Sequence, residues 1–229
     1  MKDISLIAFD ADDTLWECQT YFEAVEKEYC ELLKSYASAD EISKALFAVE
    51  TANMPLLGYG SKAFLLSLLE NAIEVSGGRL KADEVEKIIK LGKELLQLPG
   101  KPMDGVEETL NVLRERGEYH LVVFTKGELL DQENKFHRSG LKPYFDDIIV
   151  VSDKTEASYY QLCERFSINV EQLLMVGNSF RSDIEPVLKL GGWAAHIPFH
   201  TTWQHEVVEE YEHPHLLKLE YFTQLKQVL

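Results

Sequence analysis

Cysteine and positive charge are both scarce in this sequence. The three cysteines, Cys18, Cys30 and Cys163, are odd in number and lack the short spacings of metal ligands. We therefore expect reduced, mostly buried thiols in a cytoplasmic protein. The chain holds 23 Lys and Arg against 39 Asp and Glu, which gives a formal net charge of −16. Because an acidic excess of this size opposes binding to polyanions, the sequence argues against a nucleic-acid partner.

Long apolar runs are also missing. No stretch reaches the about 18 apolar residues that would indicate a membrane-spanning helix. Lys2 and Asp3 precede the first apolar segment, and this opening does not read as a signal peptide. We therefore expect no membrane partner. A hydrophobic content of 45% over 229 residues is still enough to fill a core, in one domain or in one domain with an insertion.

An apolar segment over residues 4–9 runs directly into Asp10-Ala11-Asp12-Asp13-Thr14. The segment is typical of a strand buried on both faces of a parallel sheet. Since side chains alternate along a strand, Asp10 and Asp12 leave its end on the same side, where open α/β sheets bind ligands. Two carboxylates so close need a neutralising cation or a shared proton. One of them can then act as a nucleophile and the other as an acid, although Asp is also common in turns and helix caps.

Three later segments also place polar residues after apolar strands. They are Thr125 after a strand over 120–124, Lys154 after a strand around 148–151, and Asn178 and Asp183 after a strand over 172–176. Together with Asp10-x-Asp12, these segments resemble, in order, the four signatures of the haloacid dehalogenase-like (HAD) hydrolase superfamily. Each later motif alone is weak, but the ordered set spans residues 4 to 183. The sequence is thus identified as a member of that superfamily.

The resemblance implies an α/β fold, in which a Rossmann-like parallel sheet core carries an inserted all-helical cap domain. The residue pattern agrees, because helical spacings of three and four replace the strand pattern after Leu15. Strands separated by helices then resume and end in a fifth strand at 193–197. We assign residues 1–15 and 101–229 to the core and residues 16–100 to the cap.

The resemblance further implies a phosphatase that acts on a small phosphorylated metabolite. Asp10 would attack phosphorus and become a transient aspartyl-phosphate. Asp12 would protonate the leaving group and later take a proton from the attacking water. Thr125 and Lys154 would bind the phosphoryl group, and Lys154 would also hold Asp10 in place.

The cofactor implied by the resemblance is Mg²⁺, a hard ion that takes oxygen ligands. Its expected ligands are Asp10, the main-chain carbonyl of Asp12, Asn178 and Asp183. Asn178 departs from the family pattern, which usually has Asp at this position. An amide oxygen can bind Mg²⁺ but adds no negative charge, so the departure concerns metal affinity more than reaction class.

Other residues carry less specific expectations. Within the cap, Asp40 is expected to cap a helix and Pro55 to interrupt one. In the segment that follows, Tyr59 and Lys62 are candidates for contacts that decide substrate specificity, although a plain turn between helices fits equally well. In the core, we read Asp13 as a structural residue of its turn, and we expect Lys126 near the surface.

Several alternatives remain open. On the same fold, phosphonate cleavage would need a cap lysine, for which only Lys62 is a candidate, and a sugar-phosphate mutase would pass the phosphoryl group to a second substrate. Dehalogenase-type chemistry is disfavoured by Asp12, because those relatives lack the second carboxylate. A catalytically silent binding protein is supported only by Asn178. Five C-terminal histidines with irregular spacing suggest surface or loop positions rather than a metal cluster. We expect a monomer or a weak homodimer.

Overall fold

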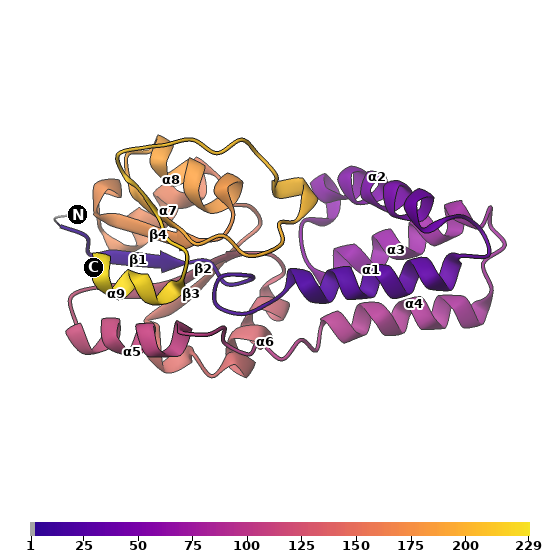
Figure 1. Cartoon of the computed structure of the whole chain (residues 1–229), viewed down its shortest axis with the longest axis horizontal. Helices are drawn as coiled ribbons and strands as arrows, with labels where there is room; N and C mark the ends of the chain where they lie inside the picture. The colour runs from indigo at the N-terminus through magenta and orange to yellow at the C-terminus, as the bar shows by residue number, and fades with distance from the viewer. Residues whose placement is uncertain (1–2) are drawn as a thin grey trace. The chain divides into compact units, whose positions relative to one another are not determined.

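The chain forms two compact units in a computed structural model that describes residues 3–229 (Figure 1). One unit combines the residues up to Gln19 with Pro99–Leu229, and the other is Thr20–Leu98. The first unit extends past Leu15 because the backbone of Trp16 is bridged to Asp12 and to Pro102. The α/β architecture implied by the resemblance is confirmed.

The first unit is built on a parallel sheet. The strands are β1 (Leu6–Phe9), β2 (His120–Lys126), β3 (Asp147–Val151), β4 (Leu173–Gly177), β5 (Trp193–His196) and β6 (Leu216–Lys218). Their order across the sheet is β3-β2-β1-β4-β5-β6, and every neighbouring pair is parallel. The chain places β2 and β3 on one side of β1 and then crosses to β4 on the other side. Such a reversal makes the carboxyl ends of β1 and β4 the expected ligand-binding edge.

Helices cover both faces of this sheet, which explains why its strands are apolar throughout. On one face, Ile7 and Phe9 pack with α5 (Val106–Arg116), α6 (Leu129–Ser139) and α9 (Leu225–Val228). On the other face, Leu6 and Ala8 pack with α7 (Glu156–Phe166) and α8 (Glu185–Lys189). Figure 1 shows α5 on one side of the sheet and α7 and α8 on the other. The alternation along β1 thus fills two separate apolar layers.

The second unit is all-helical. Its helices are α1 (Gln19–Leu33, whose first residue belongs to the other unit), α2 (Ala39–Leu57), α3 (Ser61–Val75) and α4 (Ala82–Leu95). Their apolar faces meet around buried Tyr29, Ile42, Leu68 and Ile88. The Tyr29 hydroxyl lies 2.6 Å from Asn71 Oδ1 and 2.9 Å from the carbonyl of Leu68, so this ring is both packed and hydrogen-bonded.

Two expectations for the helical unit are wrong. The N-cap of α2 is Ser38 and not Asp40, because Ser38 and Glu41 form a reciprocal capping box. Asp40 lies in the first turn instead and pairs with Lys44 at 2.8 Å. Pro55 does not interrupt α2 either. It lies in the last turn of the helix, which continues to Leu57 although proline has no N–H to donate to the carbonyl four residues earlier.

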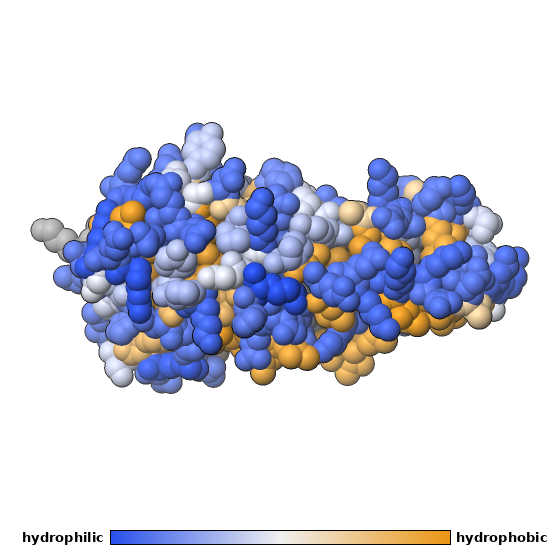
Figure 2. Space-filling model, turned by 90° about the horizontal axis from the view of Figure 1, so that it is seen from below, coloured by the Kyte–Doolittle hydropathy of each residue, from blue (hydrophilic) through white to orange (hydrophobic). Residues whose placement is uncertain are grey.

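Other elements of the first unit were not predicted. They include β6, α9 and a π-helical turn at Phe180–Ile184. No helix among residues 3–229 is long and apolar enough to cross a membrane. Most of the face seen in Figure 2 is hydrophilic, and hydrophobic residues gather along the lower edge of the helical unit at the right of the view.

Glu50 on α2 provides a test of burial in the helical unit. Burial, together with the neighbouring Glu26 carboxylate, raises the pKa of Glu50 to about 7. A carboxyl whose pKa is raised on folding favours the protonated protein, so its contribution to stability is lost as the pH rises through the folded pKa. Glu50→Gln should therefore raise the free energy of unfolding by about 1–2 kcal/mol at about pH 8 and leave it nearly unchanged at about pH 4.

Urea unfolding at the two pH values measures this effect. The matched control is Glu86→Gln, which removes an exposed carboxylate from α4. An equal gain from both substitutions would show that general charge, rather than burial of Glu50, is responsible.

Candidate active site

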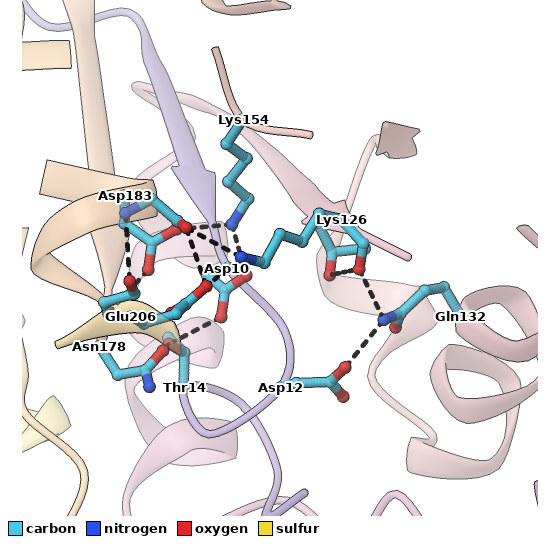
Figure 3. A network of polar contacts seen from close by, with 12 residues as sticks. Asp10, Asp12, Thr14, Lys126, Gln132, Lys154, Asn178, Asp183 and Glu206 are labelled. Carbon is cyan, nitrogen blue, oxygen red and sulfur yellow. Dashed lines mark hydrogen bonds and ion pairs between the residues drawn. The ribbon is translucent and has the colours of Figure 1, made fainter. Parts of the chain in front are cut away.

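Asp10, Lys154 and Asp183 form the centre of the site (Figure 3). The Lys154 ammonium donates to Asp10 Oδ1 at 2.5 Å and to Asp183 Oδ1 at 2.6 Å. All three residues are buried. Asp10 follows β1, Lys154 follows β3 and Asp183 lies in the segment after β4, so three strand ends supply the cluster. The two carboxylates outnumber the one ammonium, and this contact set alone carries a net negative charge.

The other carboxylate oxygen of Asp10 faces Thr14 and Asn178. The Thr14 hydroxyl lies 3.2 Å from Asp10 Oδ2 and 3.1 Å from Asn178 Oδ1. Since a hydroxyl has one proton, it can donate fully to only one of these oxygens at a time. The Thr14 hydroxyl therefore lies within hydrogen-bonding distance of one oxygen of Asp10 and one of Asn178.

The turn after β1 is held by Asp13. Its backbone is left-handed, with φ of 62°, and its carboxylate accepts from the N–H groups of Cys18 at 2.8 Å and Gln19 at 3.0 Å. Burial raises the pKa of Asp13 to about 7, although the hydrogen bonds from Cys18 and Gln19 oppose this rise. These contacts are internal to the turn and match the structural role expected for this residue.

The segment after β4 is shaped to present Asp183. The carboxylate of Asp183 accepts from the Ser179 N–H at 3.0 Å. A Cβ atom on Gly177 would lie only 2.2 Å from Asp183 Oδ2, so any larger residue there would displace this carboxylate. The Tyr159 hydroxyl from α7 lies 3.0 Å from the carbonyl of Ser182 and 3.1 Å from that of Asp183. The π-helical turn is thus braced from both sides, as is common for such turns at functional sites.

Asp12 lies in a separate set of contacts. Its two carboxylate oxygens are each 2.7 Å from the Lys135 ammonium, and they also accept from Gln132 Nε2 and Trp16 Nε1, both at 2.8 Å. Figure 3 shows Asp12 directed toward Gln132 and away from Asp183. Burial raises the pKa of Asp12. This rise is outweighed by the Lys135 ammonium and by the hydrogen bonds from Gln132 and Trp16, so the pKa of Asp12 is lowered overall. In this arrangement Asp12 is held as an ionised carboxylate whose oxygens accept from three side chains.

Thr125 and Lys126 end β2. Thr125 is buried, and its hydroxyl lies 3.4 Å from the carbonyl of Lys126. The sequence suggested a surface position for Lys126, but its side chain is mostly buried. Its ammonium forms an ion pair with Glu206 and lies 2.9 Å from the Ser182 hydroxyl. This lysine therefore belongs to the same polar network as the segment after β4.

The charges at the centre depend on one another. Burial raises the pKa of Asp10 to about 7, while the Lys154 ammonium lowers it. Burial also lowers the pKa of Lys154, but the carboxylates of Asp10 and Asp183 raise it overall. A buried ion of either sign would be costly without its partner, so the contact with Lys154 favours the ionised form of Asp10.

The donor set fits a hard cation. Asp10, Asn178 and Asp183 contribute side-chain oxygen atoms to one cluster, and oxygen is the ligand type that Mg²⁺ requires. The excess negative charge of the two carboxylates favours a positive ion in addition to Lys154. Among the described residues, no group of three or more His, Cys, Asp or Glu side chains is placed to hold a metal. Besides Asp10 and Asp183, a magnesium site would therefore depend on the amide of Asn178, main-chain carbonyls and water.

The remaining predicted residues lie elsewhere in the chain. Tyr59 is between α2 and α3, and Lys62 is in the first turn of α3, both in the helical unit. Their contact with a substrate stays a prediction. The sequence missed Gln132, Lys135 and Glu206. The two α6 residues are polar side chains three apart on a helix whose buried face also holds Phe136, and this pattern was a usable signal.

The chain belongs to the haloacid dehalogenase-like hydrolases. The family model with this description matches residues 4–191, a range that contains all four motif segments. The resemblance read from the motifs is therefore confirmed, and the protein is a hydrolase of this family.

Individual relatives include more than one activity. Haloacetate dehalogenase H-2 of Moraxella sp. (strain B) is 28% identical over 185 residues, which are 78% of this chain and 79% of that protein. A haloacid dehalogenase-like family hydrolase of Xanthomonas campestris has a TM-score of 0.89 and 34% identity, and the match covers 99% of this chain and 90% of that one. YfnB of Bacillus subtilis, assigned to the HAD hydrolases and solved with magnesium bound, shares the fold with a TM-score of 0.70 at 16% identity over 99% of both chains.

The Asp12–Lys135 contact can be tested by stability. Lys135→Met leaves Asp12 without its cation, and breaking a buried ion pair costs roughly 3–5 kcal/mol. Because Lys135 depresses the pKa of Asp12, this contribution is present above the unfolded pKa and is lost as the pH falls through the folded pKa. The destabilisation should therefore be largest near neutral pH and shrink in acid.

Chemical denaturation of a double-mutant cycle provides the measurement. The double variant Asp12→Asn/Lys135→Met has no unpaired charge and should recover more than about half of the loss. Additive effects of the two substitutions would contradict a direct interaction.

Proposed function

We propose that this hydrolase is a Mg²⁺-dependent phosphatase that cleaves a small phosphomonoester through an aspartyl-phosphate intermediate. The observation that carries the proposal is the contact of Asp10 and Asp183 with the single ammonium of Lys154. A dianionic phosphoryl group would be repelled by this negatively charged cluster unless a further cation were present. A divalent cation bound by the oxygens of Asp10, Asn178 and Asp183 meets that need. When bound, magnesium supplies positive charge that offsets the charge of the phosphoryl oxygens.

The residues of the chain then have distinct tasks. Asp10 attacks phosphorus, the ester oxygen leaves, and the carboxylate carries the phosphoryl group until water cleaves the acyl-phosphate. Lys154 favours the ionised form of Asp10 and offers its charge to the transferring group. Thr125, at the end of β2, is positioned to donate its hydroxyl to a phosphoryl oxygen. Together these groups position and stabilise the transferring phosphoryl group, which is where most of the catalysis lies.

Asp12 supplies proton transfer in this proposal. It takes a proton from the attacking water as the ionised base that Lys135 maintains. To act as the acid for the leaving group, it must first turn away from Lys135 and carry a proton. Substrates with stable leaving groups therefore need Asp12 less than those that leave as alkoxides.

The substrate class follows from the same site. We propose a small phosphorylated metabolite whose specificity is decided by the helical unit, with Tyr59 and Lys62 as candidate contacts. The enzyme would act as a monomer or a weak homodimer.

Dehalogenase chemistry is the second candidate. It is favoured by the similarity to Haloacetate dehalogenase H-2 and by the engagement of Asp12 with Lys135, because a halide leaves without needing a proton. Asp10 would attack carbon instead of phosphorus and form an ester. Release of chloride from chloroacetate without release of phosphate from any phosphomonoester would establish this candidate in place of the phosphatase.

Asp10→Asn tests the proposed nucleophile. An amide cannot form the covalent intermediate, so phosphate release from an aryl phosphate in the presence of Mg²⁺ should fall by about a thousand-fold or more. The control is Asp104→Asn, which changes an exposed aspartate and should retain full activity. If Asp10→Asn keeps more than about one per cent of the activity while its thermal midpoint is unchanged, Asp10 is not the nucleophile.

Asn178→Asp tests the magnesium ligands. A carboxylate binds Mg²⁺ more strongly than an amide, so half-maximal activity should be reached at about a three- to ten-fold lower Mg²⁺ concentration. The added charge also repels the phosphoryl group, so kcat should stay the same or fall. A Mg²⁺ titration at saturating substrate compares this variant with the wild type and with Asn134→Asp, a control at an exposed position of α6. Identical titration curves would remove Asn178 from the ligand set.

A further inference from the structure

A long segment between β5 and β6 contributes to the site without matching any motif. This strap, defined as residues 197–215, contains only one short 3₁₀ turn, at Gln204–Glu206. Segments of this length without regular structure are uncommon in compact domains and are usually functional. Arg181 donates to the carbonyl of His205, and the rings of Phe180 and Tyr211 lie 5.1 Å apart in an edge contact. The strap is therefore attached to the π-helical turn on both sides of Glu206.

Glu206 projects from this strap toward the polar side chains of Lys126 and Ser182. Its side chain is only 11% exposed, and that of its partner Lys126 is 17% exposed. Glu206 accepts from the Lys126 ammonium and from the Ser182 hydroxyl, the latter at 2.9 Å. Burial raises the pKa of Glu206. The charge and hydrogen bond of Lys126 and the hydroxyls of Ser179 and Ser182 outweigh this effect, so the pKa of Glu206 is lowered overall. The carboxylate is thus an internal anion with a complete set of donors.

This ion pair lies next to the catalytic residues. Lys126 follows Thr125 at the end of β2, and Ser182 precedes Asp183, which contacts Lys154. Figure 3 shows the Lys126 side chain reaching toward Lys154 and Asp10, with Glu206 beside it. A second anionic group on a substrate would meet Lys126 close to the position of the phosphoryl group.

Glu206 removes the attraction that Lys126 would otherwise exert. In a site partly shielded from water, an unpaired ammonium would bind a second anionic group strongly. With Glu206 in contact, that positive charge is neutralised, and a carboxylate faces any incoming anion. The attachment of the strap at Arg181 and Phe180 holds Glu206 in this position.

We propose that Glu206 is a specificity-determining residue that pairs with Lys126 and excludes substrates carrying a second anionic group beside the phosphoryl group. The preferred phosphomonoesters then have an uncharged or cationic remainder, and phosphorylated carboxylic acids and bisphosphates are poor substrates. This inference rests on the proposed phosphatase function, because it takes the phosphoryl group to bind at Asp10.

Binding of non-hydrolysable phosphonates tests the inference without turnover. Calorimetry in excess Mg²⁺ compares methylphosphonate, which has one anionic group, with phosphonoacetate and 3-phosphonopropionate, which add a carboxylate at two distances. Glu206→Gln should raise the affinity for a carboxylated phosphonate relative to methylphosphonate by about ten-fold or more, since the charge of Lys126 is no longer neutralised while the amide still accepts from Ser182.

Two further variants separate charge from folding. Lys126→Met leaves Glu206 negative and should lower the same affinity ratio by about three-fold or more. Lys126→Met/Glu206→Gln removes both charges and should return the ratio to within about three-fold of the wild type. Glu209→Gln, at an exposed position of the strap, should leave the ratio unchanged.

The binding measurement requires no turnover of a substrate. An unchanged ratio in a folded Glu206→Gln variant, or a failure of the wild type and of every variant to bind phosphonates, overturns the specificity assignment whether or not the wild type releases phosphate. Failure of the wild type to release phosphate from any ester, together with the expected shift in ratio, would overturn the phosphatase assignment alone. If Glu206→Gln does not fold, the Lys126→Met arm decides the inference by itself.

Discussion

The site depends on one lysine shared by two buried aspartates. Without the Lys154 ammonium, Asp10 and Asp183 would be two carboxylates in a dry environment, and at least one of them would take up a proton. The surrounding structure serves this contact. Gly177 leaves room for Asp183, Tyr159 braces the backbone behind it, and β1 and β4 hold the two aspartates at neighbouring strand ends. Burial of any of these three charges without its partner would be costly.

The centre of the site could be predicted because strand ends converge. Asp10, Thr125 and Lys154 each follow an apolar run, and parallel strands bring such residues to one edge of the sheet without any knowledge of side-chain packing. The apolar runs of the sequence also predicted five of the strands, β1 to β5. They did not predict β6, whose residues Leu216–Lys218 form only a short strand at the edge.

Other parts of the site could not be read from local patterns. The partner of Asp12 is Lys135, which is 123 positions away, and the contact depends on how α6 is rotated about its axis. Glu206 lies in an irregular segment whose path is set by tertiary contacts with Arg181 and Phe180. The N-cap of α2 was missed for a simpler reason. Ser38 and Asp40 are both good capping residues, and only Ser38 has Glu41 three positions later.

The place of β1 in the sheet has a consequence for how the protein folds. This strand precedes its two partners in the chain, since Leu6 pairs with His120 on one side and with Leu173 on the other. The inserted helical unit widens the first of these gaps, so the central strand closes loops that span much of the chain. The entropic cost of such loops grows only slowly with length, but pairing of this range slows folding. During synthesis the apolar strand β1 therefore lacks one of its two neighbouring strands until β4 has emerged.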